Sequence, residues 1–217
     1  MFRGFTDDAL DFYQFIHDSG FSTDSYNSRK SVFHEDIKPQ LNLLLEQAAD
    51  AIVDLSPGIQ HPDSDRVGNP FTRGGARGFG WGALSRPKKN RRSDLQLFVA
   101  LRPQTIRVGL YASREYGKAV FSRLMKHIYR NPEEFCKLLD GLEPEGIILC
   151  EPAGNKDLGQ MVPLQFVRAA PNVAIGEQNE IDLLKSFPIA DGGNPEFVLE
   201  VINVFRLLIP IREFLLE

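Results

Sequence analysis

Apolar residues recur at helical spacing through the first 55 residues of the chain. Thr6 is placed to cap a first helix, which ends at Gly20. The apolar face of this helix is formed by Ala9, Phe12, Tyr13 and Ile16. A second helical stretch is predicted from about 24 to 55, with an interruption near Pro39, because proline lacks the N–H that a helix interior requires. Its apolar stripe, from Ile37 to Ile52, is typical of a helix face that packs on a core.

Alternating apolar positions after residue 94 predict an antiparallel hairpin. The alternation runs through Leu95, Leu97, Val99 and Leu101, and then through Ile106, Val108 and Leu110. The four residues 102–105 between the two runs supply the turn. One face of the hairpin is then buried, and Gln96, Arg107 and Tyr111 on the other face would project toward solvent or a ligand; we expect ordinary solvent-facing positions for them.

The rest of the chain combines helical and strand patterns. Helical spacing returns over 119–128 and again over 135–139 behind Asn131 and Pro132. Short strands are expected at 147–150 and 164–167, residues 178–184 fit neither pattern, and Pro195 to Leu215 form a strongly apolar final helix. Helices at both ends of the chain around a central hairpin predict an α+β fold with a mainly antiparallel sheet. We expect one domain that spans residues 1–217.

Residues from about 56 to 93 show no period of either kind and predict a long, basic, Gly-rich loop. Between Arg66 and Arg92, 27 residues include eight basic side chains and no Asp or Glu. The remainder of the chain holds 17 of the 25 basic residues against all 29 acidic ones, so an acidic body carries one cationic segment. Guanidinium groups and aromatic rings on a flexible backbone suit a polyanion or a stacked base. A solvated surface loop is the alternative.

Eight residues of this loop are the predicted nucleic-acid contacts. Phosphates would be met by Lys88, Lys89, Arg91 and Arg92, and base edges by Arg73 or Arg77, with Arg86 completing the basic set. Trp81, the only tryptophan, would stack on an exposed or flipped base, together with Phe79. Tryptophan is also highly buried on average, so a core anchor that pins the loop to the body is an equal alternative for Trp81.

Familiar catalytic and metal-binding patterns are missing from the sequence. There is no P-loop, no His-Glu-x-x-His and no Gly-x-Ser-x-Gly, the four histidines are scattered, and Cys136 and Cys150 form no Cys-x-x-Cys pair. We therefore expect no catalytic residue, metal or cofactor. A third possible function is an enzyme that uses a carboxylate or arginine site for a phosphorylated small molecule.

A mean hydropathy of -0.22 and the lack of an apolar run near 18 residues argue against a membrane span. The opening residues lack the layout of a secretory signal, which predicts a cytoplasmic protein.

Three parts of the chain, the start, the central strand pair and the ending, resemble an uncharacterised, conserved-hypothetical domain family. At the start the resemblance is carried by Phe2-Arg-Gly-Phe5 and by Tyr26-Asn-Ser-Arg-Lys30. The strand pair from Leu95 to Tyr111 and the ending at Pro210 and Phe214-Leu215 are also similar to that family. The chain departs from the family at Ser25-Tyr26, where the family has Trp-Phe, and it lacks the family's Arg-Asp-x-Arg-Phe-x-x-Asp-Lys segment.

A second resemblance covers residues 69–98. It is carried by Asn69-Pro-Phe71, Gly74-Gly75-Ala76, Trp81-Gly-Ala83, Lys89-Asn-Arg-Arg92 and Asp94-Leu-Gln96-Leu-Phe98. This progression resembles the N-terminal region of McrB-like AAA+ proteins of modification-dependent restriction systems. The resemblance implies a target-recognition module for restriction or anti-phage defence, with DNA, modified or unmodified, and an AAA+ ATPase domain or subunit as partners. The alternative is a protein-interaction module without nucleic-acid contact, in which the final helix docks a partner or an adjacent domain and the basic loop meets an acidic protein surface.

Overall fold

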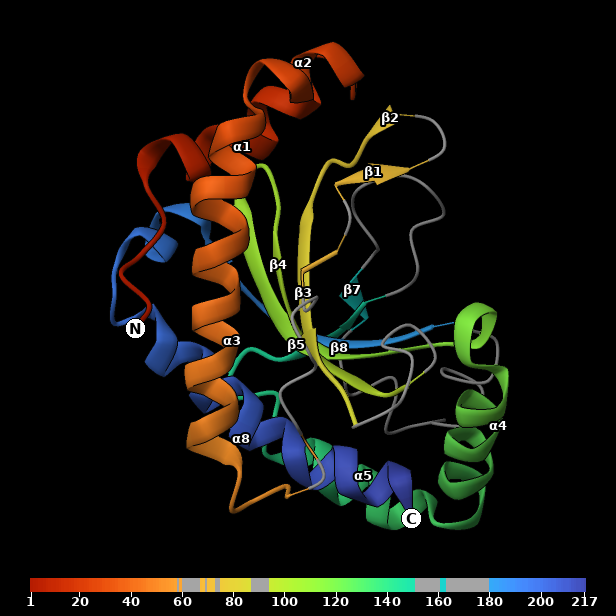
Figure 1. Ribbon diagram of the computed structural model, residues 1–217. Coiled ribbons are helices and arrows are strands. Elements are labelled where there is room, and N and C mark those ends of the chain that lie inside the picture. The colour runs from red at the N-terminus through yellow and green to blue at the C-terminus, as the bar shows by residue number, and fades with distance from the viewer. Residues whose placement is uncertain are drawn as a thin grey trace.

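The computed structural model in Figure 1 describes residues 1–57, 59, 67–68, 70–72, 75–86, 94–150, 161–162 and 180–217. Within this part of the chain, a six-stranded sheet has the order β3-β4-β5-β8-β6-β7. Every strand pair in it is antiparallel. Helices from both ends of the chain surround the sheet. The α+β fold with a mainly antiparallel sheet, predicted from the sequence, is confirmed.

The N-terminal helices begin and end close to the predicted positions. α1 (Asp7–Asp18) is capped by Thr6, whose Oγ1 accepts a hydrogen bond from the N–H of Ala9 at 3.3 Å. The second helical stretch is divided into α2 (Thr23–Ser28), a π-helix η1 (Val32–Ile37) and α3 (Lys38–Ile52). Pro39 lies in the first turn of α3, where its missing N–H costs little. The predicted interruption is therefore a π-helical turn directly before Pro39.

The strands of the main sheet are β3 (Gly80–Leu84), β4 (Gln96–Leu101), β5 (Thr105–Ser113), β6 (Ile148–Cys150), β7 (Met161–Val162) and β8 (Glu180–Pro188). β4 and β5 form the predicted hairpin. β6 matches the strand expected at 147–150, and β8 includes most of the segment that fitted neither pattern. The strand expected at 164–167 lies outside the described residues.

β3 lies within the region 56–93, where the missing period predicts only a loop. That prediction was wrong for Gly80–Leu84, and also for the short pair β1 (Phe71–Thr72) and β2 (Gly75–Ala76). Backbone pairing with β4 holds β3 in the sheet, so β3 needs no regular alternation of side chains. A Cβ added at Gly82 would lie 2.6 Å from Leu45 Cδ1, so the glycine allows α3 to approach the strand closely.

The later helices are α4 (Arg114–Arg130), α5 (Pro132–Asp140), a 3-10 turn η3 (Ile189–Gly193) and α8 (Phe197–Leu216). α8 packs against α3, β5, α4 and α5. Of the two helical stretches predicted near the start of the chain, the second provides the main contact through α3. Together α3 and α8 cover one face of the sheet (Figure 1). The apolar final helix is therefore a central part of the core.

Close backbone approach in the middle of the sheet generates a first prediction. A Cβ added at Gly109 of β5 would lie 2.4 Å from the carbonyl oxygen of Leu183 and 2.9 Å from Phe98 Cε1. Because paired backbone cannot move aside easily, we expect Gly109→Ala to lower the free energy of unfolding by about 1 to 3 kcal/mol in chemical denaturation. Gly141→Ala is the control, since nothing lies within 4 Å of the added Cβ. Equal losses in the two variants would contradict this account.

Candidate nucleic-acid interface

Three of the eight predicted contact residues are described by the structure, and all three lie in or beside β3. Arg77 precedes the strand, Trp81 is inside it and Arg86 follows it. The other five, Arg73, Lys88, Lys89, Arg91 and Arg92, lie outside the described residues. The structure brings Arg77 and Trp81 to one end of β3, where Phe79 lies between them, and it places Arg86 beyond the other end.

Trp81 is the centre of an aromatic cluster on the sheet. Its ring stacks on Phe98 of β4, with the centroids 4.1 Å apart and the planes 10° from parallel. Tyr111 of β5 meets the same ring edge to face at 5.2 Å, and Trp81 Nε1 donates to Gln96 Oε1 at 3.3 Å. These contacts tie β3 to its neighbouring strands. They give Trp81 the packing role that was one of its two alternatives, and base stacking stays a prediction.

Arg77 takes part in a cation–π arrangement. Its guanidinium carbon lies 5.6 Å from the centroid of the Phe79 ring, and that of Arg102, just after β4, lies 5.2 Å from the same ring. The main-chain N–H of Arg77 donates to the carbonyl of Pro70 at 2.7 Å. Two positive charges are therefore gathered around one aromatic ring, at the edge of the cluster that contains Trp81.

The solvent-facing positions predicted for Gln96, Arg107 and Tyr111 are wrong. Gln96 is 2% exposed, Arg107 is 9% exposed and Tyr111 is half-buried. The face that they share is itself packed, because a second core cluster is formed there by Ala83, Phe98, Ala100 and Leu184. The uninterrupted apolar run over 97–101 is the sequence signal of a strand that is buried on both faces.

Buried polar groups lie beside these residues on the same face. The Tyr111 hydroxyl donates to Glu180 Oε1 at 2.8 Å, and burial together with the Glu180 charge raises the pKa of Tyr111. Burial also raises the pKa of Asp182 to about 7, while the positive charges of Arg107 and Arg102 act in the opposite direction. Asp182 Oδ1 and Arg107 Nε are buried without a hydrogen-bond partner among the described residues. A carboxyl that titrates near neutral pH is therefore built into the sheet.

Arg86 is held by a buried carboxylate. Its Nε donates to Asp94 Oδ1 at 3.0 Å, its Nη2 also donates to Oδ1, and its main-chain N–H donates to Oδ2 at 3.0 Å. The Asp94 side chain is 1% exposed, against 25% for Arg86. Burial alone would raise the pKa of Asp94, but the hydrogen bonds and charge of Arg86 outweigh it and lower this pKa. The pair joins the two residues that flank the connection 87–93.

A second arginine completes this network. Arg212 of α8 is 1% exposed, and its Nη1 donates to Ser56 Oγ at 3.0 Å and to Glu213 Oε1 at 2.6 Å. Burial lowers the pKa of Arg212, while the charges of Glu213 and Asp94 act in the opposite direction. We call these five residues, Ser56, Arg86, Asp94, Arg212 and Glu213, the buried clamp. It links the segment after α3, the base of the β3–β4 connection and the last turns of α8.

Sequence reasoning missed Asp94 and Arg212, although each leaves a signal. Asp94 is the first acidic residue after the long basic run. Arg212 is one of only two basic residues in the apolar segment of α8. A charged residue in such a segment needs a buried partner, because an unpaired buried charge costs several kcal/mol. Sequence spacing did not indicate that the charge of Asp94 acts on Arg212.

Among the described residues, no group of three or more His, Cys, Asp or Glu side chains could hold a metal ion. Nor is any described helix long and apolar enough to cross a membrane. The chemistry that the described part of the interface offers is therefore that of guanidinium groups, aromatic rings and isolated carboxyls.

The buried clamp generates a second prediction. We expect Asp94→Asn to lower the free energy of unfolding by about 3 kcal/mol, because it leaves Arg86 without its carboxylate partner and removes one of the two negative charges that act on the buried Arg212. The matched control is Asp11→Asn, which removes a more exposed partner of Arg29 at 2.8 Å and should cost about 0.5 kcal/mol. Urea denaturation of both variants measures the difference. Similar small losses would show that the clamp does not stabilise the fold.

The pKa of Asp182 generates a third prediction. The pKa of Asp182 in the folded protein, about 7, exceeds its ordinary value of 3.8, so protonation of Asp182 favours the folded state. The contribution of the protonated carboxyl to the free energy of unfolding is fully present below about pH 4 and is lost as pH rises through 7. We expect the unfolding free energy of the wild type to fall by about 1 to 3 kcal/mol between pH 5 and 8, relative to that of Asp182→Asn. The exposed Glu145→Gln serves as control. Parallel pH profiles for the wild type and Asp182→Asn would refute the assignment.

Comparison with models of protein families found no match for this chain, and comparison with curated protein sequences found none either.

Proposed function

We propose that the chain is a nucleic-acid-binding module whose main contact is the connection between β3 and β4. The observation that carries this proposal is the Arg86–Asp94 pair, which ties both ends of residues 87–93 to the buried clamp. This connection contains Lys88, Lys89, Arg91 and Arg92 and no acidic residue. Each cation that neutralises a phosphate releases counterions, and this release is the main source of affinity for a nucleic acid.

The Arg86–Asp94 pair favours binding because it reduces the conformational entropy that is lost on binding. A segment that becomes ordered on binding loses conformational freedom, and this loss reduces the affinity. The Arg86–Asp94 pair already restricts both ends of the basic connection in the free protein. Arg86 is held by Asp94 and therefore serves in this proposal as an anchor, while the four basic residues between the ends meet the phosphates.

The more specific proposal is a target-recognition module of a McrB-like restriction or anti-phage defence system. It is supported by the motif progression from Asn69 to Phe98 and by the aromatic cluster around Trp81 beside Arg77. The target would be DNA, modified or unmodified, and an AAA+ ATPase domain or subunit would act on the bound complex. Trp81 would contribute either by stacking on a base or by holding β3 in place.

One observation weighs against the alternative of a protein-interaction module. That alternative assigns the apolar final helix to a docking surface, but eleven side chains of α8 are buried within the fold. The apolar residues that would have formed the docking surface already pack on α3, β5, α4 and α5. The other half of that alternative, an acidic protein surface that meets the cationic connection 87–93, is not affected by the burial of α8, and we propose a nucleic acid as the partner of this connection instead.

A fourth prediction tests the proposed contact. In the quadruple variant of Lys88, Lys89, Arg91 and Arg92 to alanine, we expect weaker binding to duplex DNA and a flatter dependence of affinity on salt. Each lost phosphate contact should remove about 0.9 from the slope of log K against log salt. Fluorescence anisotropy with a labelled duplex at several salt concentrations measures both quantities.

The control for this experiment changes the same number of charges elsewhere. Arg3, Lys30, Lys137 and Arg206 are exposed and also comprise two lysines and two arginines. Their replacement by alanine should leave the slope close to that of the wild type. If the loop variant and the control variant behave alike, the connection 87–93 has no specific part in binding.

A further inference from the structure

α4 carries a second concentration of positive charge, which the sequence analysis did not single out. Gly117 has a non-helical backbone, with φ of -134° and ψ of 50°, and it separates the first turn of α4 from the rest. Residues 118–130 after this kink contain no Asp or Glu. They contain four exposed basic side chains, Lys118, Arg123, Lys126 and Arg130. A chain with a net charge of -4 therefore has one helix that is strongly basic.

The basic residues occupy one side of this helix. At 100° per residue, Lys118, Lys126, Arg130 and Arg123 fall on a continuous arc, opposite the buried Phe121, Leu124 and Ile128. Within the part of the chain that the structure describes, none of the four forms an ion pair or a side-chain hydrogen bond. No carboxylate among the described residues therefore pairs with these four cations.

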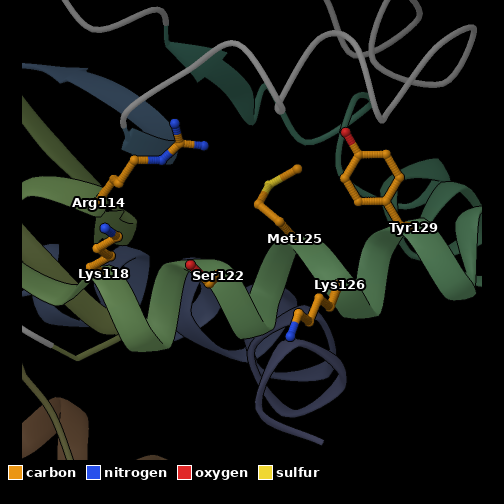
Figure 2. Close-up of a pocket in the computed structure, with 6 residues that line it drawn as sticks. All are labelled: Arg114, Lys118, Ser122, Met125, Lys126 and Tyr129. Carbon is orange, nitrogen blue, oxygen red and sulfur yellow. The ribbon is translucent and has the colours of Figure 1, made fainter.

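An open pocket of about 420 Å³ runs along the same helix (Figure 2). The six described residues that line it belong to α4, and Figure 2 shows that Met125 and Tyr129 project from the same side of the helix. The ring of Tyr129 is 54% exposed and is therefore accessible to a ligand. Lys118 and Lys126 complete the polar part of the lining. The surface thus combines cations with an accessible ring.

This helix lies at the same end of the molecule as the buried clamp. The ring of His127 on α4 contacts Phe214 on α8, with the centroids 4.3 Å apart. Phe214 directly follows Arg212 and Glu213 of the clamp, and the clamp holds both ends of the basic connection 87–93. One helix, α8, therefore joins the two cationic segments of an otherwise acidic protein.

We infer that the exposed basic side of α4 is a second phosphate-binding surface, which contacts the backbone of the same duplex DNA as the connection between β3 and β4. This inference rests on the proposed function. Residues 118–130 extend over about 18 Å, or about five base-pair steps of 3.4 Å, so the four cations can reach several phosphates of one strand. Tyr129 donates or accepts a hydrogen bond at the sugar-phosphate backbone beside them.

The test compares two triple variants in duplex binding. The α4 variant combines Lys118→Gln, Arg123→Gln and Arg130→Gln. The control variant combines Lys30→Gln, Arg3→Gln and Arg206→Gln. Each variant removes one lysine and two arginines from exposed positions. Anisotropy is measured with a labelled 20-base-pair duplex over a range of salt concentrations. We expect the slope of log K against log salt to fall by about 0.9 to 2.7 in the α4 variant, and to stay near the wild-type value in the control. The single variant Lys126→Gln should lower it by about 0.9 and is used if the triple variant does not fold.

The outcomes separate this inference from the proposed function. An unchanged slope in the α4 variants, together with a reduced slope in the quadruple variant of residues 88–92, overturns the inference and leaves the proposed function in place. Failure of the wild type to bind the duplex overturns both. Poly-L-glutamate is titrated in parallel, and wild-type protein that binds this polymer through α4 but does not bind DNA indicates an acidic protein as the partner instead.

Discussion

A guanidinium group that is almost completely removed from water imposes the strictest constraint on this fold. Arg212 lies on the last helix, and an unmatched charge at that depth would cost several kcal/mol. It donates hydrogen bonds to Glu213 on the same helix and to Ser56 after α3, and the negative charge of Asp94 before β4 also acts on it. The constraint links three segments, because Ser56 and the charge of Asp94 act on Arg212 only when their segments assemble with α8. The apolar packing of α8 on α3 and β5 supplies the burial, and the polar network determines which segments meet.

The elements with a strong period could be predicted from the sequence. Thr6 caps α1 as expected, and the alternation around Val99 and Val108 predicts the β4–β5 hairpin. β3 could not be predicted in this way, because its pairing depends on backbone hydrogen bonds and on glycines that admit Tyr13 and Leu45. The side chains of such a strand leave no regular pattern.

The sequence predicted which residues of the candidate site carry charge, but not which side chains contact one another. The basic run indicated which residues carry positive charge, yet it could not show that Asp94 binds Arg86 or that Trp81 stacks on Phe98, because both contacts depend on strand register. The opposite error occurred at Gln96 and Arg107. Alternation was interpreted as one buried and one exposed face, whereas aromatic and small residues between these positions close the second face as well.

The way in which the β3–β4 connection is fastened affects how the protein could change during evolution. When both ends of a segment are held by an ion pair and a strand ladder, the residues between them can be replaced or lengthened without altering the register of the sheet. Doubling the length of such a loop costs only about 0.6 kcal/mol in closure entropy. The Arg86–Asp94 pair therefore separates the stability of the sheet from the composition of the connection that it closes. A scaffold of this kind can acquire new binding preferences through variation in one short segment.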